Sequence, residues 1–448
     1  MKSNNSAKLI HGPIGKTLAR MTVAMTLGMV GMVAFNLADT FFVGKLGTDQ
    51  LASLSFTFPV VLVISSIALG LGFGASAVIS RAIGEGDHHK VQRLTTDSLL
   101  LALLIVISFV VIGLFTIKPL FKTLGASPQL LPYIVTYMKI WYLGMPFVVV
   151  PMVGNNAIRA TGDAKTPSII MLIAFGINVI LDPMLIFGIG PFPELGIKGA
   201  ALATVFSRFT TFSVALWVLI KRDKMITFDL TGISNILQSW KQVLFIGVPF
   251  AGSRIVIPIT IGIITRIISS YGNFAVAGYG VASRIEFFSL AVIAALASVF
   301  SPFIGQNLGA KKFTRVVDAI NLSHRFSIFW EIFIWILLIS FRNTIAGVFN
   351  NHPEVIATTA LYLAIVPFSY SLQGVFMLST TGLNVMHKPL QAAGLTIMQM
   401  FLICVPLVLI GSHLFGLTGI FVAIAFTYIV SGIASRIVLM KYLKQVIN

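Results

Sequence analysis

Long apolar stretches separated by short polar connections run along the whole chain. Each stretch holds about 20 residues or more, which lets a helix cross ~30 Å of hydrocarbon. The pattern predicts an all-α integral membrane protein with twelve transmembrane helices. We place these spans near 17–43, 51–79, 94–117, 133–157, 168–188, 197–220, 243–268, 276–304, 321–345, 357–381, 390–411 and 416–438.

The two halves of the chain resemble each other. The segment ISRAIGEGDHHKV (79–91) aligns without gaps with IGQNLGAKKFTRV (304–316) at an offset of 225 residues, and ELGIKGA (194–200) aligns with LFGLTGI (414–420) at an offset of 220. Six spans per half is an even number, so the repeats share one orientation and are related by an axis along the membrane normal. We therefore predict two parallel-repeat six-helix bundles around a central cleft. They divide the chain into an N-terminal lobe (1–220), a cytoplasmic linker (221–241) and a C-terminal lobe (242–448).

Composition agrees with a membrane protein, because only 10% of the residues are charged whereas soluble proteins carry roughly 25%. The net charge of +17 would indicate nucleic-acid binding in a soluble chain. In membrane proteins, however, Lys and Arg collect in cytoplasmic connections, and alternate connections here carry 21 and 5 of them. The bias predicts a multi-pass membrane protein with both termini in the cytoplasm, and we expect its location to be the plasma (bacterial inner) membrane. Its partner is then the lipid bilayer rather than nucleic acid.

Two carboxylates lie near the outer ends of predicted spans, Asp39 in FNLADTFFVGKLG and Asp182 in INVILDPMLIFG. A carboxylate inside hydrocarbon is costly and is by default a functional candidate. Asn36 precedes Asp39 by three residues and Asn178 precedes Asp182 by four, so each pair shares a helix face. Thr204 lies ~10 Å below the outer end of the sixth span at 1.5 Å per residue. These five residues form our candidate cation-coupling site.

Two carboxylates at similar depth in a low dielectric cannot both stay ionised cheaply. At least one should bind a proton, or both should share a cation such as Na⁺. The competing interpretation is that Asp39 only caps a helix end at the outer interface. A capping role fits Asp182 less well, because Pro183 follows Asp182 within the span and removes a backbone hydrogen bond. Beyond H⁺ or Na⁺ we expect no cofactor and no structural metal.

Other polar and adaptable side chains are candidates for a substrate cleft. Met side chains adapt to varied ligands, and a Met stripe runs along the first span, although such a stripe is more often core packing. The tentative cleft residues are Met29, Met32, Tyr142, Asn155, Asn156 and Gln373.

The C-terminal half carries intramembrane charges of its own, namely Arg254, Arg284, Glu286 and Glu331. Such charges usually pair with one another or reach towards the interface, and otherwise they form a relay or anchor a substrate. Arg208 in the N-terminal half has the same two interpretations. We expect at least one Arg–Glu contact among Arg254, Arg284 and Glu286.

Several motifs together resemble the multidrug and toxic compound extrusion (MATE) family, and most closely its branch named for DNA-damage-inducible protein F. They are the run around Asp39, the Gly-rich ALGLGFGASAVISRAIGEGD (68–87), RATGDAKTP (159–167) and the run around Asp182. The resemblance implies that Asp39, Asp182, Asn178 and Thr204 form a cation-coupling site, with H⁺ the better candidate. It also implies an antiporter that exports lipophilic, often cationic, drugs by alternating access, acting as a monomer.

The sequence departs from the family pattern in two places. The first span has no proline, whereas some members bend that span at a proline. Another branch has a Na⁺ site built on carboxylates of spans 7 and 10, but here span 7 has no acid and span 10 no charge.

Two other classes of function were compared with antiport. A flippase for lipid-linked glycans or other anionic lipids would use a basic cleft, whereas cationic drugs need an acidic one. An enzyme is not indicated, because the sequence has no metal-ligand cluster and no nucleophile–base spacing.

Overall fold

The computed structural model describes residues 7–228 and 232–447, and these are almost entirely helical. In the N-terminal part, the elements are η1 (Lys8–Ile10), α1 (Ile14–Gly44), α2 (Thr48–Glu85), α3 (His88–Thr123), α4 (Leu131–Gly144), α5 (Pro146–Ala160), α6 (Lys165–Phe187), α7 (Ile197–Trp217) and η2 (Val218–Arg222). The remaining elements are α8 (Ile233–Ile268), η3 (Ser269–Tyr271), α9 (Asn273–Ser289), α10 (Ala291–Gly309), α11 (Phe313–Ser340), α12 (Arg342–Phe349), α13 (Pro353–Ile365), η4 (Pro367–Ser369), α14 (Tyr370–Val385), α15 (Pro389–Ile397), η5 (Met398–Cys404) and α16 (Val405–Ile447).

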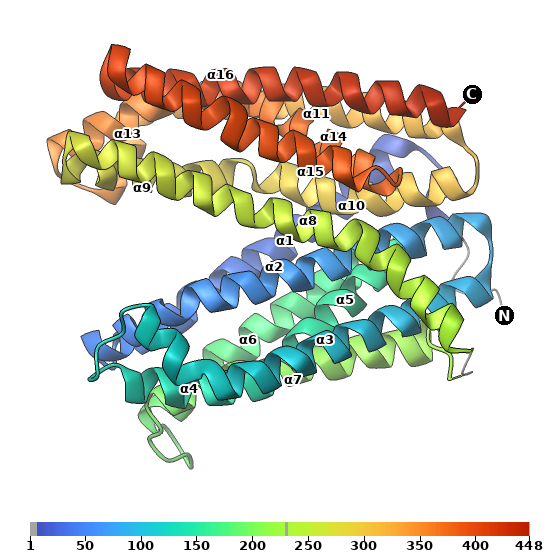
Figure 1. Cartoon of the computed structure of the whole chain (residues 1–448), viewed down its shortest axis with the longest axis horizontal. Coiled ribbons are helices and arrows are strands. Elements are labelled where there is room, and N and C mark those ends of the chain that lie inside the picture. The colour runs from blue at the N-terminus through green and yellow to red at the C-terminus, as the bar shows by residue number, and fades with distance from the viewer. Residues whose placement is uncertain (1–6, 229–231, 448) are drawn as a thin grey trace. The chain divides into compact units, whose positions relative to one another are not determined.

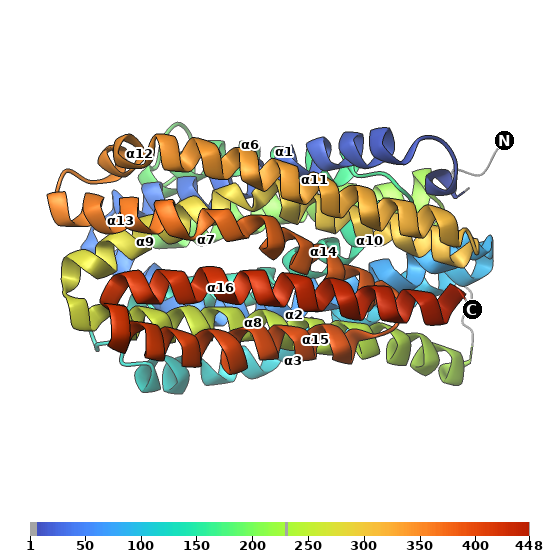
Figure 2. The same ribbon diagram turned by 90° about the horizontal axis from the view of Figure 1, so that it is seen from above.

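The described helices provide twelve membrane spans. Ten helical stretches are long and apolar enough to cross a membrane, and the bent pair α4–α5 makes an eleventh. One of the ten, Pro389–Val446, has 58 residues, far more than the ~20 that a single crossing needs. It reverses direction within α16, and the two antiparallel arms are plain in Figures 1 and 2. The predicted all-α fold with twelve spans is confirmed.

The reversal in α16 explains one of the sequence repeats. Gly416, at the break, has φ 60° and ψ −141°, a conformation that glycine adopts without a steric penalty. Gly196 precedes α7 with φ 55° and ψ −131°. The two glycines occupy matching positions of the aligned segments 194–200 and 414–420. The repeat therefore encodes the same backbone turn in both halves of the chain.

Some spans are broken where proline interrupts the backbone ladder. α4 and α5 meet at 42° just before Pro146, which has no N–H to donate and disfavours helix at the preceding residue. α13 and α14 are separated by the short turn η4, which begins at Pro367. α6, by contrast, continues through Pro183 to Phe187.

The helices form two compact units. Of the residues that the structure describes, 7–8 and 24–248 belong to the first unit, and 9–23 with 249–447 belong to the second. α1 and α8 each contribute residues to both units. Figure 1 shows α3, α4, α6 and α7 in the first unit, and α9, α13, α14 and α16 in the second.

The start of α1 is attached to the second unit by hydrogen bonds to the segment before it. The Leu9 N–H donates to Gln306 Oε1 (3.0 Å), and Asn307 Nδ2 donates to the Leu9 carbonyl (3.2 Å). Lys312 Nζ and Arg315 Nη1 donate to the backbone carbonyls of Ile10 and Gly12, both at 3.0 Å.

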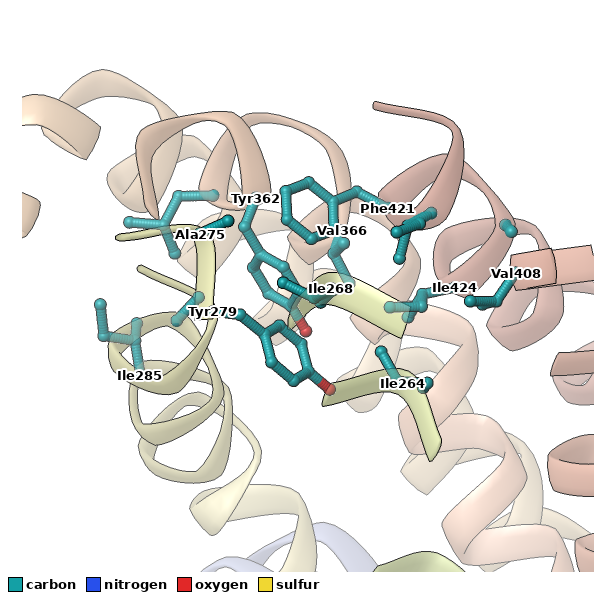
Figure 3. Close-up of a cluster of buried hydrophobic side chains, with 14 of the residues drawn as sticks. Ile264, Ile268, Ala275, Tyr279, Ile285, Tyr362, Val366, Val408, Phe421 and Ile424 are labelled. Atoms are coloured by element: carbon teal, nitrogen blue, oxygen red, sulfur yellow. The ribbon is translucent and has the colours of Figure 1, made fainter. Parts of the chain in front are cut away.

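Each unit has an apolar interior, and large apolar side chains also cover much of its surface. In the second unit, a buried cluster gathers side chains of α8, α9, α13 and α16 around Tyr279 and Tyr362 (Figure 3). Outward-facing side chains such as Phe115 (83% exposed) and Phe329 (72%) would be an aggregation liability in water. Towards lipid tails they are the expected surface.

Candidate functional site

The candidate site in the first unit depends on a close approach of α6 and α7. A Cβ added at Gly199 of α7 would collide with the backbone carbonyl of Leu185 on α6. Small residues at such positions let membrane helices pack tightly. Asp182 lies three residues before Leu185, and Thr204 lies five residues after Gly199. Both of these polar side chains are buried.

Asn178 and Asp182 occupy successive turns of one face of α6. Asn178 Nδ2 donates to Asp182 Oδ1 over 3.1 Å, and neither side chain is exposed. The prediction that Asn178 and Asp182 lie on the same helix face is therefore confirmed.

Four oxygen atoms of the site are buried without a hydrogen-bond partner among the described residues. They are Asp39 Oδ1, Asn178 Oδ1, Asp182 Oδ2 and Thr204 Oγ1. Buried polar atoms are rarely left unpaired in native structures. Carboxylate oxygens can take up a proton, and carboxylate, amide and hydroxyl oxygens all coordinate hard cations such as Na⁺. The donor set thus fits the binding of a proton or a small cation.

Two further residues belong to the site, Tyr137 of α4 and Arg208 of α7. Arg208 interacts electrostatically with Asp39, and its guanidinium lies over the Phe35 ring at 4.4 Å. Tyr137 is buried and interacts with Asp39, Asp182 and Arg208. Arg208 is one turn beyond Thr204 on the same helix, and this spacing was the only sequence signal for its place here.

Asn36 is not placed with the other candidates. Its side chain is exposed, and its backbone carbonyl accepts a hydrogen bond from the Thr40 hydroxyl at 2.8 Å. On α1, the structure brings Asp39 and Phe35 to the site instead.

The tentative cleft residues of the first unit differ in their surroundings. Met32 is 43% exposed and Met29 is half-buried. Tyr142 is buried against Gly113 of α3. On α5, Asn156 donates to the Met152 carbonyl at 2.7 Å and accepts from Arg159, whereas Asn155 Oδ1 has no partner among the described residues.

In the second unit, Gln373 is also held by a neighbour. Its Oε1 accepts a hydrogen bond from Gln399 Nε2 over 2.7 Å, and both side chains are buried.

The expected Arg–Glu contact of the C-terminal half is not formed, so that prediction is wrong. Glu286 accepts hydrogen bonds from the hydroxyls of Tyr362 and Tyr428 instead. Arg284 is exposed, and Arg254 lies over the Phe250 ring at 5.1 Å. Glu286 on α9 faces tyrosines from α13 and α16, which no spacing within the α9 sequence could indicate.

A separate ionic cluster joins the α5–α6 connection to the end of η2. Asp163 accepts from the Thr166 N–H (3.0 Å) and hydroxyl (2.6 Å), and Arg222 Nη2 is 2.8 Å from Asp163 Oδ2. Arg222 also pairs with Asp223 at 2.9 Å. Burial alone would raise the pKa of Asp163, but the hydrogen bonds from Thr166 and the charge of Arg222 outweigh it and lower this pKa below its usual value.

We expect Asp163→Asn to lower the free energy of unfolding by about 1 kcal/mol, because a partly exposed ion pair and its hydrogen bonds contribute modestly. The pKa of Asp163 is lower in the folded than in the unfolded protein. Its contribution is therefore complete above the unfolded pKa of about 4 and is lost as the pH falls below that value. Thermal unfolding of parent and variant at neutral and acidic pH measures this. A difference that stays constant down to acidic pH would contradict the assignment.

Comparison with known proteins identifies the family. The MatE family model matches residues 24–184 and 249–410. The chain belongs to the MATE family. The two matched segments of this MATE protein begin 225 residues apart, which is the offset of the internal sequence repeat. Members of this family are transporters and not enzymes, as the sequence predicted.

Proteins of known name or structure match nearly the whole chain. A protein named FAD transporter from Shewanella oneidensis is 38% identical and covers 95% of this chain and 94% of its own. The multidrug export protein MepA of Staphylococcus haemolyticus is 26% identical over 94% of this chain and 92% of its own. The Vibrio cholerae MATE transporter VcmN, in a structure described as the bent form, is 28% identical, covers 97% of this chain and 98% of its own, and has a TM-score of 0.92.

Proposed function

We propose that this MATE transporter is a proton-coupled antiporter that exports small molecules by alternating access. The observation that carries the proposal is the group of four buried, unpaired oxygens contributed by Asp39, Asn178, Asp182 and Thr204. A site with this donor set can hold a proton in one conformation and release it in another. From the positive-inside bias we further propose that both termini lie in the cytoplasm. We also propose that the protein is a monomer in the bacterial inner membrane, as its bacterial relatives suggest.

The charges around the site favour a proton over Na⁺. Arg208 interacts electrostatically with Asp39, and a positive guanidinium nearby opposes the binding of a metal cation. Asp182 forms no ion pair among the described residues, and the groups that interact with it are Asn178, Asp39 and Tyr137. Neutralisation of Asp182 by a proton removes the cost of a buried charge without a second cation.

In the proposed cycle, loss of the proton restores the charge repulsion between the Asp39 and Asp182 carboxylates and attracts water to the site. The equilibrium then shifts towards the conformation that accepts substrate. A proton taken up from the outside reverses the shift and releases the substrate. A ligand can shift a conformational equilibrium only by its differential affinity for the two states. Coupling therefore requires that proton and substrate favour different states.

Two substrate classes are proposed. Relatives named multidrug export protein or probable multidrug resistance protein are 25–27% identical to this chain, and their names favour lipophilic, often cationic, drugs as the substrates. The relative named FAD transporter is 38% identical over almost the whole chain, and this higher identity favours an aromatic anion such as flavin adenine dinucleotide. The two classes differ in charge and are readily distinguished by experiment.

Transport by the purified protein in liposomes tests the proposal. We expect an imposed pH gradient to drive uptake of either a fluorescent lipophilic cation or flavin adenine dinucleotide. An imposed Na⁺ gradient at constant pH should drive neither. Uptake driven by Na⁺ alone would overturn proton coupling. Transport of only one of the two substrates decides between the substrate classes.

A further inference from the structure

One face of α11 in the second unit carries buried polar side chains. The polar residues buried along this helix are Ser323, His324, Ser327 and Glu331. Glu331 is 0% exposed, and within the described structure neither of its carboxylate oxygens has a hydrogen-bond partner. The proposed coupling site of the first unit does not use this acid.

Contacts one turn to either side of Glu331 show what its carboxylate faces. Ser327 Oγ donates to the Ser371 backbone carbonyl at 3.3 Å, and the Trp335 ring lies 5.1 Å from the Phe368 ring. Ser327 and Trp335 are four residues before and after Glu331, so the three share one face of α11. The carboxylate therefore faces the segment from Phe368 to Ser371, where η4 ends and α14 begins.

The packing around Glu331 is close. Tyr370, within the facing segment, is also 0% exposed, and it interacts electrostatically with Glu331. One turn further along α14, a Cβ added at Gly374 would collide with Ser327 Oγ, as is typical of tightly packed membrane helices. An ionised carboxylate without water, a donor or a cation is very costly in a membrane interior. A neutral acid, which carries its own proton, avoids this cost.

Few titratable side chains on the neighbouring helices face Glu331. The sequences of α10 and η4 contain none. The sequence of α14 contains only Tyr370, which also interacts with Glu286 of α9. On α13, the Tyr362 hydroxyl donates to Glu286, and Glu354 in the first turn is exposed.

The charged groups on α11 and α12 leave Glu331 without a counter-ion. His324, two turns before Glu331 on the same helix, contacts Ser379 and Arg436. Arg342 of α12 is exposed. Over residues 7–228 and 232–447, no ion pair involves Glu331.

A metal cation fits the surroundings of Glu331 less well than a proton does. Hard metal cations bind through several oxygen ligands at once. The Ser327 hydroxyl already contacts the Ser371 carbonyl, and Trp335 Nε1, which has no partner among the described residues, can only donate. Within the described ranges, no group of three or more His, Cys, Asp and Glu side chains could hold a metal ion. A proton needs neither added ligands nor a cavity.

We propose that Glu331 is a second proton-binding site, which holds a proton while α11 packs against η4 and α14. The proton is bound to a carboxylate oxygen, and it passes to water when this packing opens and water reaches the acid. The site binds no metal and uses none of the residues of the Asp39–Asp182 site. Each of the two proposals can therefore fail without the other.

Infrared spectroscopy of the full-length protein in lipid at neutral pH tests the proposal, because protonated carboxylic acids in apolar surroundings give resolved carbonyl bands. Labelling the glutamate carboxyl groups with a heavy carbon isotope shifts their bands away from those of Asp39 and Asp182. Glu331→Gln should lose one shifted band, since the amide resembles the neutral acid in shape but cannot titrate. A Glu331→Gln spectrum with every carboxylic-acid band of the parent would overturn the proposal.

The matched control is Glu354→Gln, which makes the same chemical change at an exposed position. An exposed glutamate is ionised at neutral pH, so this variant should keep every carboxylic-acid band of the parent. Loss of the band that is assigned to Glu331 in the control variant would assign that band to Glu354 and overturn the proposal.

Two further measurements do not depend on the folding of Glu331→Gln. Glu331→Asp, with only glutamate labelled, should lose one shifted band and gain an unshifted one, because the acid stays neutral in the same place. In the labelled parent, the Glu331 band should weaken as the pH is raised and recover when the pH is lowered. A labelled parent without any glutamic-acid band at neutral pH, or with a band that no pH change alters, would contradict reversible proton binding.

Discussion

Asp182→Asn should abolish proton-driven transport and leave the protein folded in the membrane. The substituted amide has the shape of the protonated acid but cannot release a proton, so the site stays in one charge state. Its oxygen can still accept the hydrogen bond that Asn178 donates to Asp182. We therefore expect the free energy of unfolding to change by less than about 1 kcal/mol, while gradient-driven uptake falls to the level of protein-free liposomes.

The matched control is Asp49→Asn, which makes the same chemical change at an exposed position in the first turn of α2. It should transport like the parent. Thermal unfolding and reconstitution yield, measured for both variants, separate a loss of coupling from a loss of protein. An Asp182→Asn variant that transports as fast as the parent would place the coupling site elsewhere.

The fold was predictable from sequence because the physics of a bilayer acts on each span separately. A helix must satisfy its own backbone and present about 20 apolar residues to lipid, and both requirements are visible in the linear sequence. The reversal of α16 was visible too, because Gly416 repeats Gly196 in an aligned segment. Breaks within a span were harder to predict, because a proline does not interrupt every helix that contains it. Pro146 separates α4 from α5, yet α6 continues through Pro183.

The site was only partly predictable, because helical spacing identifies the face of a helix but not the helix that it meets. The contact between Asn178 and Asp182 followed from a spacing of four residues. The places of Tyr137 and Arg208 beside Asp39 depend on how α4 and α7 pack against α1, and sequence spacing does not record this.

The same limit explains the error at Glu286. Charge alone suggested Arg254 or Arg284 as the partner of Glu286. The donors are tyrosines 76 and 142 residues away along the chain, and only tertiary packing brings them to the carboxylate.

The packing of α6 against α7 leads to the last prediction, which compares two glycines. Gly199→Ala should destabilise the protein and impair transport, because the new Cβ meets the Leu185 backbone carbonyl, which cannot rotate away as a side chain would. Overpacking of this kind costs about 1–3 kcal/mol. The two helices must move apart, and Asp182 and Thr204 then no longer keep their relative positions.

Gly176→Ala is the matched substitution within α6, because a Cβ at Gly176 would have no atom within 4 Å. Alanine favours a helix over glycine by up to about 1 kcal/mol, so this variant should be as stable as the parent or slightly more stable. Thermal unfolding and liposome transport of both variants measure the comparison. Opposite signs for the two changes in stability are expected, and equal effects would mean that the close approach at Gly199 does not position the site.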